Sequence, residues 1–282
     1  MLVDKPAGIT SHDAVQRVRR ALGIRSVGHT GTLDPFATGL LVVLVGRATR
    51  LARFVDPQPK TYLATARLGA RTDTDDLTGT VIEEMPVEGL SRERVFAALA
   101  GFEGEQRQRP PAYSAKHIGG ERSHRLARRG ALVEPPEVTV TVYRIDPVAW
   151  VSPALTFRAV VSTGTYLRAI ARDLGSRLGV GAHLTALRRE AIGGLRVEDA
   201  VALDRVTREA LLPAAQVLRH LPAVELDPEA KAAVVHGRAV ADSGAVGHRG
   251  TGAVALLEGT ELVAVARAED GWLRPMVVLG TP

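Results

Sequence analysis

The apolar residues of this chain recur with two different periods, which predict a mixture of helices and strands. Residues 12–22 predict a helix, because apolar residues recur there at helical spacing between Ser11, which can cap the start, and Gly23, which can end it. Residues 60–69 alternate between apolar and polar positions, which predicts a strand with one buried face. The continuous apolar run at 40–45 predicts a buried strand.

The middle of the chain continues this mixed order. Residues 91–100 predict a short helix, and residues 137–145 and 154–162 predict strands. The second of these strands leads through Thr163-Gly164-Thr165 into a helix whose apolar side carries Leu167, Ile170, Ala171, Leu174 and Leu178. Strands and helices do not alternate regularly, as they would around a parallel sheet, so we expect an α+β fold.

The pattern changes after about residue 222. Short apolar runs there are separated by Glu258-Gly259 and Asp270-Gly271, which are turn signals. They predict three strands, at 253–257, 261–267 and 273–279. We therefore expect a main domain at 1–221 and a small β-rich domain at 222–282.

Composition narrows the class of protein. The chain has 282 residues, 45% of them hydrophobic and 24% charged, and no apolar run approaches the roughly 20 residues of a membrane span. The first residues lack the basic-then-apolar plan of a signal peptide. Without any cysteine, the chain can form neither a disulfide nor a thiolate metal site. We expect a soluble, cytoplasmic protein.

Charge points weakly to a polyanionic partner. The net charge is +5 and the isoelectric point is about 9.9, although many proteins with no nucleic-acid role reach such values. The distribution is more informative. Residues 107–130 hold seven Lys or Arg and two His against one Glu, interrupted by prolines, a glycine pair and Tyr113. Such a composition argues against a single helix with one solvent-exposed basic face.

The sequence GHTGTLDPFATGLLVVLVG, residues 28–46, places a single carboxylate, Asp34, where a loop runs into the buried strand. A carboxylate can be a general acid or base, a nucleophile or a metal ligand. Metal binding needs several ligands, and only His29 is near in sequence. Asp before proline also commonly starts a turn, so the residues alone leave the role of Asp34 open.

Other common sites are absent or weak. The acidic run at 73–76 departs from the EF-hand pattern and is better interpreted as a polar loop than as a metal site. Neither phosphate-binding loop, GxxxxGK[ST] or GxGxxG, occurs in the chain, and the GxSxG elbow of many hydrolases is missing as well.

The stretch GHTGTLDPFATGLL closely resembles the catalytic motif of the bacterial tRNA pseudouridine-55 synthases, the TruB family of pseudouridine synthases. Five further segments resemble that family in the same order: DKPAGITSHDAV (4–15), KTYLATARLGARTDTDD (60–76), PPAYSAKHIGG (110–120), STGTYLRAIARDLG (162–175) and GAHLTALRR (181–189). One matching motif would be weak, whereas six in order are specific. The last 60 or so residues resemble the family's small PUA-like β domain.

The resemblance implies both a fold and an activity. The fold is the pseudouridine synthase fold, a mixed and largely antiparallel sheet flanked by helices, followed by the PUA-like domain. The activity is conversion of uridine-55 in the T loop of tRNA to pseudouridine, with no cofactor and no metal. The partner is the T loop and stem of tRNA, bound by a monomer with no membrane attachment.

The resemblance also assigns catalytic residues. Asp34 matches the essential aspartate, which attacks the sugar or the base or otherwise promotes loss of uracil. Tyr62 matches the tyrosine that packs on the flipped base and helps to remove its proton. Arg168 matches the arginine that pairs with the aspartate, and a guanidinium can hold a carboxylate through two parallel hydrogen bonds. Alone, Tyr62 is an ordinary aromatic on a buried strand face, and Arg168 is an ordinary helix residue.

Four further assignments concern binding. Tyr166 and Leu187 match residues that line the uracil pocket with Tyr62, and His29 matches a histidine that contacts the RNA where the base has left the stack. Lys5-Pro6 matches a structural loop near the site. Residues 107–130 resemble an RNA-gripping insertion. The chain departs from the family there, because Lys116-His117 replaces an apolar residue followed by lysine and His124 replaces a tyrosine, which puts the insertion's detailed contacts in doubt.

Two alternatives share this fold. One is an RNA-guided pseudouridine synthase, and the other is a non-catalytic RNA-binding protein. The short chain and the intact insertion favour the stand-alone enzyme over the first. The presence of Asp34, Tyr62 and Arg168 together argues against the second, since a pure binder need not keep all three.

Overall fold

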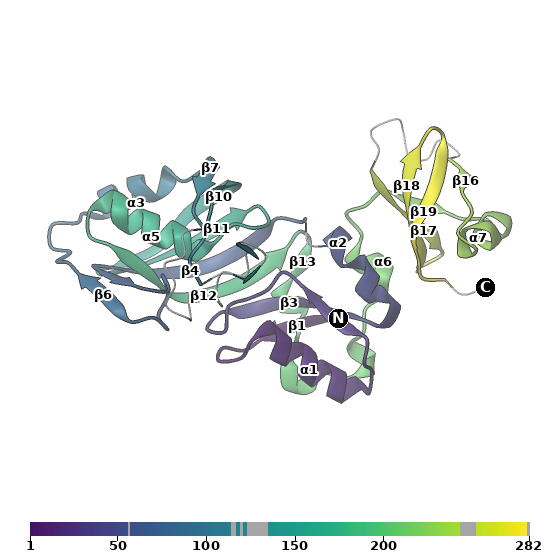
Figure 1. Cartoon of the computed structure of the whole chain (residues 1–282), viewed down its shortest axis with the longest axis horizontal. Helices are drawn as coiled ribbons and strands as arrows, with labels where there is room; N and C mark the ends of the chain where they lie inside the picture. The colour runs from purple at the N-terminus through teal and green to yellow at the C-terminus, as the bar shows by residue number, and fades with distance from the viewer. Residues whose placement is uncertain (56, 114–116, 119–120, 123–134, 243–251, 281–282) are drawn as a thin grey trace.

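In the residues that it describes, the computed structural model has a large β-sheet in the first three quarters of the chain, a smaller one near the C-terminus and two small hairpins (Figure 1). It describes residues 1–55, 57–113, 117–118, 121–122, 135–242 and 252–280. Within these residues, no helix has the length and apolar character needed to cross a membrane.

The large sheet runs in the order β14-β1-β3-β12-β4-β11-β10-β7, with β13 paired to β12 and β2 paired to β3. Its strands are β1 (Leu2–Lys5), β2 (Val27–Thr30), β3 (Thr38–Val45), β4 (Lys60–Leu68), β7 (Gly104–Gln108), β10 (Val138–Val151), β11 (Ala154–Val161), β12 (Ala182–Ile192), β13 (Leu195–Arg196) and β14 (Val201–Ala202). The pairs β1·β14 and β3·β12 are parallel and the others described are antiparallel. The predicted mixed, largely antiparallel sheet is confirmed.

Helices cover this sheet as the α+β class requires. Helices α3 (Arg92–Ala100) and α5 (Leu167–Leu178) contact each other and pack over β10, β4 and β12, whereas α1 (Ser11–Leu22) packs beside β2 (Figure 1). The shorter elements are η1 (Gly46–Leu51), α2 (Ala52–Val55), η2 (Val197–Asp199), η3 (Leu203–Arg205), η4 (Arg208–Ala210) and α6 (Ala214–Val217). Two small hairpins pair β5 (Ala70–Thr72) with β6 (Val81–Glu84), and β8 (His117–Ile118) with β9 (Glu121–Arg122).

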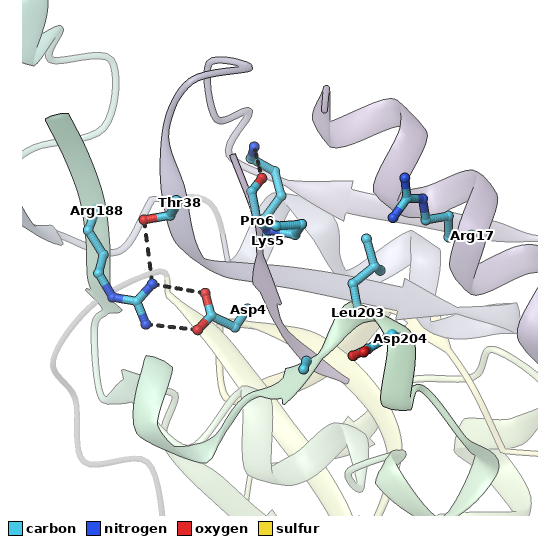
Figure 2. A pocket seen from close by; sticks show the side chains of 9 residues that line it. Asp4, Lys5, Pro6, Arg17, Thr38, Arg188, Leu203 and Asp204 are labelled. Atoms are coloured by element: carbon cyan, nitrogen blue, oxygen red, sulfur yellow. Dashed lines mark hydrogen bonds and ion pairs between the residues drawn. The ribbon is translucent and has the colours of Figure 1, made fainter. Parts of the chain in front are cut away.

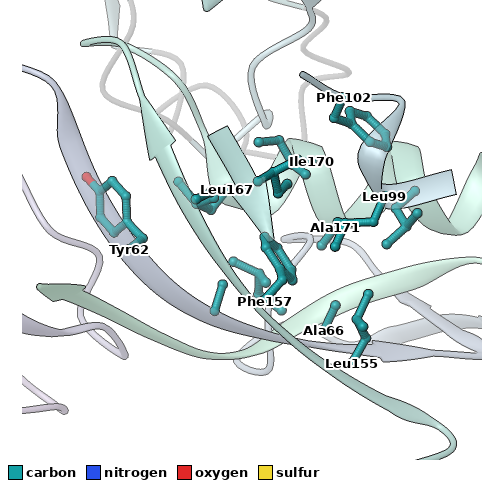
Figure 3. Close-up of a cluster of buried hydrophobic side chains, with 14 of the residues drawn as sticks. Tyr62, Ala66, Leu99, Phe102, Leu155, Phe157, Leu167, Ile170 and Ala171 are labelled. Carbon is teal, nitrogen blue, oxygen red and sulfur yellow. The ribbon is translucent and has the colours of Figure 1, made fainter. Parts of the chain in front are cut away.

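The predicted alternation of β4 places its apolar residues in the core beneath α3 and α5. Tyr62, Ala64, Ala66 and Leu68 are all buried, and they join an apolar cluster that includes Phe157 of β11. Tyr62 lies at one end of this cluster with its hydroxyl pointing away from it (Figure 3). The strand therefore presents one polar atom at the edge of an otherwise apolar core.

The start of α1 differs from the sequence prediction. The N-cap is Thr10, whose side chain accepts from the Asp13 N–H, while the Asp13 carboxylate accepts from the Thr10 N–H, which makes a capping box. Ser11 is instead buried inside the first turn, where its hydroxyl contacts the backbone of Leu33. The prediction that Ser11 caps the helix is wrong, because this tertiary contact holds the hydroxyl.

The second sheet has the order β15-β17-β18-β19-β16 and carries helix α7 (Pro228–Val235). Its strands are β15 (Ala223–Glu225), β16 (Val240–Ala241), β17 (Ala253–Glu258), β18 (Glu261–Glu269) and β19 (Trp272–Val278). This sheet shares a core with the first, since Leu44 of β3 and Val277 of β19 belong to one buried apolar cluster. Arg47 and Arg50 of η1 also donate to the carbonyls of Leu279 and Val278. The division at residues 221 and 222 stays a prediction.

Candidate active site

A cavity of about 1,080 Å³ opens beside β4, β12 and the start of α5. The residues that the sequence assigned to catalysis and substrate binding all line it: His29, Asp34, Tyr62, Tyr166, Arg168 and Leu187. These residues are far apart in the sequence and reach the cavity from β2, the β2–β3 loop, β4, β12 and α5. The structure thus brings the whole predicted set together at one place.

The loop that carries Asp34 is fixed on both sides of the carboxylate. The Ser11 hydroxyl accepts from the Leu33 N–H at 2.9 Å and donates to the Leu33 carbonyl at 3.2 Å. On the other side, the Pro35 carbonyl accepts from the Gly8 N–H at 2.8 Å. Such contacts fix a functional side chain in advance, so that no free energy is spent on ordering it during the reaction.

Lys5 is a buried cation beneath this loop. Its ammonium donates to the carbonyls of Pro6 and Ile9 at 2.8 Å each and to that of Pro35 at 3.3 Å. Burial lowers the pKa of Lys5 to about 8, and the positive charge of Arg189 acts in the same direction while the Asp34 carboxylate opposes both. Lys5 therefore holds the 6–9 turn and the Asp34 loop together.

Arg189 of β12 is a second buried cation at this loop, and the sequence analysis did not identify it. Its Nε donates to the Leu40 carbonyl at 2.7 Å and one terminal nitrogen to the Gly31 carbonyl at 2.8 Å. The other terminal nitrogen lies 3.5 Å from the Tyr62 hydroxyl. A Cβ atom at Gly39 would clash with the backbone of Arg189, so glycine is needed where β3 approaches β12.

Arg168 lies in the first turn of α5 and reaches Asp34. One terminal nitrogen donates to Asp34 Oδ1 at 3.0 Å and to the Tyr113 carbonyl at 3.0 Å. The other donates to the Thr74 carbonyl at 3.0 Å and lies 3.4 Å from Asp76 Oδ2. The two parallel bonds to one carboxylate are not formed. The guanidinium instead bridges two carboxylates and two carbonyls.

Asp76 comes from the acidic run that the sequence predicted to be a polar loop. Its side chain is only 6% exposed and lines the cavity. Oδ1 accepts from the hydroxyls of Thr74 and Thr78 and from the Thr78 N–H, at 2.9, 2.6 and 2.9 Å. No group of three or more His, Cys, Asp or Glu in the described part of the chain could hold a metal ion. Asp76 belongs to the Arg168 network, which sequence spacing did not reveal.

The pKa of Asp34 is set by its burial and by neighbouring charges of both signs. The side chain is 31% exposed and lines the cavity. Desolvation raises the pKa of Asp34 above its usual value, Arg168 lowers it, and the nearby Asp76 raises it again. The carboxylate thus lies where a developing positive charge on a ligand would stabilise it strongly.

Apolar and aromatic side chains form the walls of the cavity. Leu187 of β12 and Tyr62 of β4 lie on neighbouring strands, and Tyr166 precedes the first residue of α5. His29 of β2 is half-buried at the edge of the lining. Flat and apolar surfaces next to a carboxylate–guanidinium pair suit a planar ring with polar edges.

Most of the predicted insertion at 107–130 lies outside the described residues. This includes Lys116 and His124, at which the sequence departs from the family pattern. The described residues at its start, from Gln108 to Tyr113, contact the cavity side of α5.

A second cavity of about 450 Å³ lies beside β1 and is lined by Asp4 and Lys5 of that strand and by Arg188 of β12 (Figure 2). Two of its charged residues form an ion pair: Arg188 donates to both oxygens of Asp4, at 3.0 and 2.8 Å, and approaches the Thr38 hydroxyl at 3.4 Å. Lys5 also lines this cavity, although its ammonium donates to the carbonyls of Pro6 and Ile9 and to that of Pro35 in the Asp34 loop. No residue of the predicted catalytic set lines the second cavity.

Comparison with solved structures identifies the class of protein to which the fold belongs. The chain superposes on an H/ACA ribonucleoprotein bound to a substrate RNA containing 2′-deoxyuridine with a TM-score of 0.76 and 26% identity, covering 99% of this chain and 84% of that one. It superposes on a Cbf5-Nop10-Gar1 complex with a TM-score of 0.74 and 30% identity, covering 94% and 77%. The predicted pseudouridine synthase fold is confirmed.

Sequence comparison then identifies the family. Residues 19–167 match the N-terminal domain of the TruB family pseudouridylate synthases, and residues 168–223 match the C-terminal domain of tRNA pseudouridylate synthase B. The chain is 42% identical to tRNA pseudouridine synthase B of Thermobifida fusca, covering 99% of this chain and 97% of that protein. It is 44% identical to the Gloeobacter violaceus protein of the same name, covering 99% and 98%. The chain belongs to the TruB family of pseudouridine synthases.

Proposed function

We propose that the protein is a tRNA pseudouridine synthase that isomerises uridine-55 in the T loop. The observation that carries this proposal is the 3.0 Å contact between Asp34 and Arg168 inside a cavity walled by Tyr62, Tyr166 and Leu187. The full-length relatives named tRNA pseudouridine synthase B support tRNA as the substrate. We further propose that a single chain acts on each tRNA, in the cytoplasm.

The chemistry is an isomerisation that balances without a co-substrate. The N1–C1′ bond of uridine breaks, the uracil rotates, and a C5–C1′ bond forms. The proton on C5 is lost and N1 ends protonated, so no electrons are gained or lost. Because the reacting atoms are shielded in a folded loop, the nucleotide must leave the stack and enter the cavity, which costs a few kcal/mol.

Asp34 would act where the glycosidic bond breaks. Loss of uracil develops positive charge on the sugar, and a nearby carboxylate stabilises or captures it. Attack on the sugar, attack on the base and assisted elimination each need the ionised carboxylate, and the choice among them stays open. Arg168 would hold the carboxylate toward the substrate.

The walls would hold the detached uracil. Tyr62 would stack on the ring and place its hydroxyl near C5 to help remove the proton, while Tyr166 and Leu187 would enclose the ring. Stacking on an aromatic side chain contributes about 1–3 kcal/mol per base, which offsets the cost of extrusion. His29, at the edge, would contact the RNA where the base has left the stack.

The rival functions explain less of the site. A binding protein has no need for a buried carboxylate held by a buried arginine, since such a pair is costly to desolvate. An RNA-guided enzyme is the nearer rival, because one superposed structure is an H/ACA ribonucleoprotein bound to a substrate RNA, at 26% identity. The higher identity to tRNA pseudouridine synthase B over nearly the whole chain favours the stand-alone reaction.

The test uses purified protein alone and unmodified tRNA that carries tritium on C5 of its uridines. Formation of pseudouridine releases one tritium to water, and we expect about one release per tRNA and none from tRNA with cytidine at position 55. Asp34→Asn should abolish release, because it keeps the shape and removes the charge. It should change tRNA affinity by only a few-fold.

Asp199→Asn, an exposed substitution in η2 away from the cavity, is the matched control and should react like the wild-type protein. Release that requires an added guide RNA would favour the RNA-guided alternative. Undiminished release by a pure Asp34→Asn preparation would contradict the proposed role of the carboxylate.

A further inference from the structure

The side chain of Gln108, at the end of β7, is paired with the backbone of Tyr166. Gln108 is 4% exposed. Its Nε2 donates to the Tyr166 carbonyl at 3.2 Å, and its Oε1 accepts from the Tyr166 N–H at 2.8 Å. A side-chain amide that both donates to and accepts from one residue imitates a neighbouring strand and fixes the backbone on both sides of that residue.

Tyr166 is the residue at which α5 begins. It occupies the N-cap position in an extended conformation, and its side chain makes no capping hydrogen bond to the helix. Helices usually begin at a Ser, Thr, Asp or Asn, whose side chain fixes the geometry of the first turn. Here the cap residue is instead hydrogen-bonded by the side chain of Gln108, which comes from a strand 58 residues away in sequence.

The position of Tyr166 sets the positions of two side chains of the site, its own and that of Arg168. Its own ring lines the cavity, and Arg168, two residues further along, must reach Asp34 at 3.0 Å from the first turn of the helix. A shift of the cap residue therefore moves one wall of the uracil site and the guanidinium together.

The backbone after Gln108 contacts the same helix. The Tyr113 carbonyl accepts from the Arg168 nitrogen that also binds Asp34, and the Arg109 carbonyl accepts from Arg172 at 2.9 Å. The segment 108–113 thus holds the first two turns of α5 through one side chain and two carbonyls. It is also where the basic insertion at 107–130 begins.

We propose that Gln108 is a positioning residue for the isomerisation, acting on Tyr166 and, through the first turn of α5, on Arg168 and Asp34. This inference rests on the proposed function. Gln108 does not line the cavity, so its effect lies in the chemical step and not in contact with RNA. Misplacing a catalytic group by about 1 Å can cost about a hundredfold in rate.

The test is Gln108→Glu, which replaces only the donating NH2 by an oxygen. The carboxylate can still accept from the Tyr166 N–H, but it faces the Tyr166 carbonyl with a negative charge. We expect the single-turnover rate at saturating tRNA to fall at least tenfold at neutral pH, with the tRNA dissociation constant changed less than threefold. The introduced carboxyl regains a donor when protonated, so the ratio of variant to wild-type rate should rise as the pH falls.

Gln106→Glu is the matched control. Gln106 lies on the same strand, and its amide donates to the Glu103 carbonyl at 3.5 Å, away from α5 and the cavity. Its rate ratio should stay near one at every pH. Gln108→Met, which removes both hydrogen bonds at similar volume, should lower the rate without any recovery at low pH.

Three results would overturn the inference. Wild-type rates for both Gln108 variants would show that Tyr166 needs no partner. A Gln108→Glu rate ratio that does not rise as the pH falls would show that the donated bond to Tyr166 is not what matters. A loss in rate that is accompanied by weaker tRNA binding and a lower melting temperature would assign Gln108 to general stability. A wild-type protein that releases no tritium would instead refute the proposed function on which the inference rests.

Discussion

Replacing Arg168 by lysine keeps the positive charge yet should slow the chemical step tenfold or more. The guanidinium uses both terminal nitrogens, one for Asp34 and the Tyr113 carbonyl and the other for the Thr74 carbonyl and Asp76. Lysine has one nitrogen on a flexible stem and cannot occupy both positions. Arg168→Lys therefore either releases Asp34 or leaves the Thr74 and Asp76 side without a donor.

The structure sets the size of the effect. The Arg168 side chain is only 4% exposed, so water cannot easily replace it as a donor to its partners. Each buried acceptor left without a hydrogen bond costs about 1–3 kcal/mol. A factor of ten in rate corresponds to about 1.4 kcal/mol. If the lost contact is the one that aims Asp34, the expected slowing is between about tenfold and a hundredfold. The binding of tRNA should change much less.

Single-turnover rates at saturating tRNA measure this step separately from binding. Arg177→Lys is a suitable control, because Arg177 lies on the same helix but donates to the Ala98 carbonyl and stacks on Phe102, away from the cavity. It should react at the wild-type rate. A near wild-type rate for Arg168→Lys, with weaker tRNA binding, would mean that Arg168 contacts an RNA phosphate and would refute the pairing role.

Three further predictions follow from charge and packing. The reaction rate should fall as the pH drops through the raised pKa of Asp34, because the ionised carboxylate is the active form and predominates above that pKa. Asp76→Asn removes a negative charge that helps to raise the pKa of Asp34, so it should move this acidic fall in rate to lower pH. An acidic fall at the same pH in the variant would contradict this. Affinity for tRNA should fall linearly on a log–log plot against salt, as expected if the basic residues at 107–130 displace counterions, whereas a flat plot would favour contacts to bases. Calorimetry should show one unfolding transition, because Leu44 and Val277 share a core, and two transitions would contradict that coupling.

The periodic elements were predictable because their cause is local. Burial of alternate residues gives β4 its period of two, and burial of one stripe gives α5 its helical spacing, so both patterns are visible without knowing any partner. The set that meets at the cavity came from the family resemblance. No period or spacing brings Tyr62 and Leu187 to the same cavity as Asp34.

What the sequence did not reveal depends on contacts between distant residues. Ser11 and Thr10 both carry hydroxyls before the same helix, and the contact of Ser11 with Leu33 decides which of them caps it. Arg189 is charged yet 1% exposed, so it obscures the apolar pattern of β12. Its two shorter hydrogen bonds go to backbone carbonyls, which leave no trace in side-chain composition.

The position of Asp34 in the loop before a core strand is stabilised by buried cations. Lys5 donates to the Pro35 carbonyl and Arg189 to the Gly31 carbonyl, both in the loop, whereas Arg168 donates to the carboxylate itself. These bonds anchor the loop, while the second carboxylate oxygen receives no hydrogen bond from Arg168. A carboxylate that is desolvated, held at one oxygen and open toward the cavity at its other side gains most when a positive charge forms beside it. The same burial that raises its pKa makes it responsive to the charge that develops as the glycosidic bond breaks.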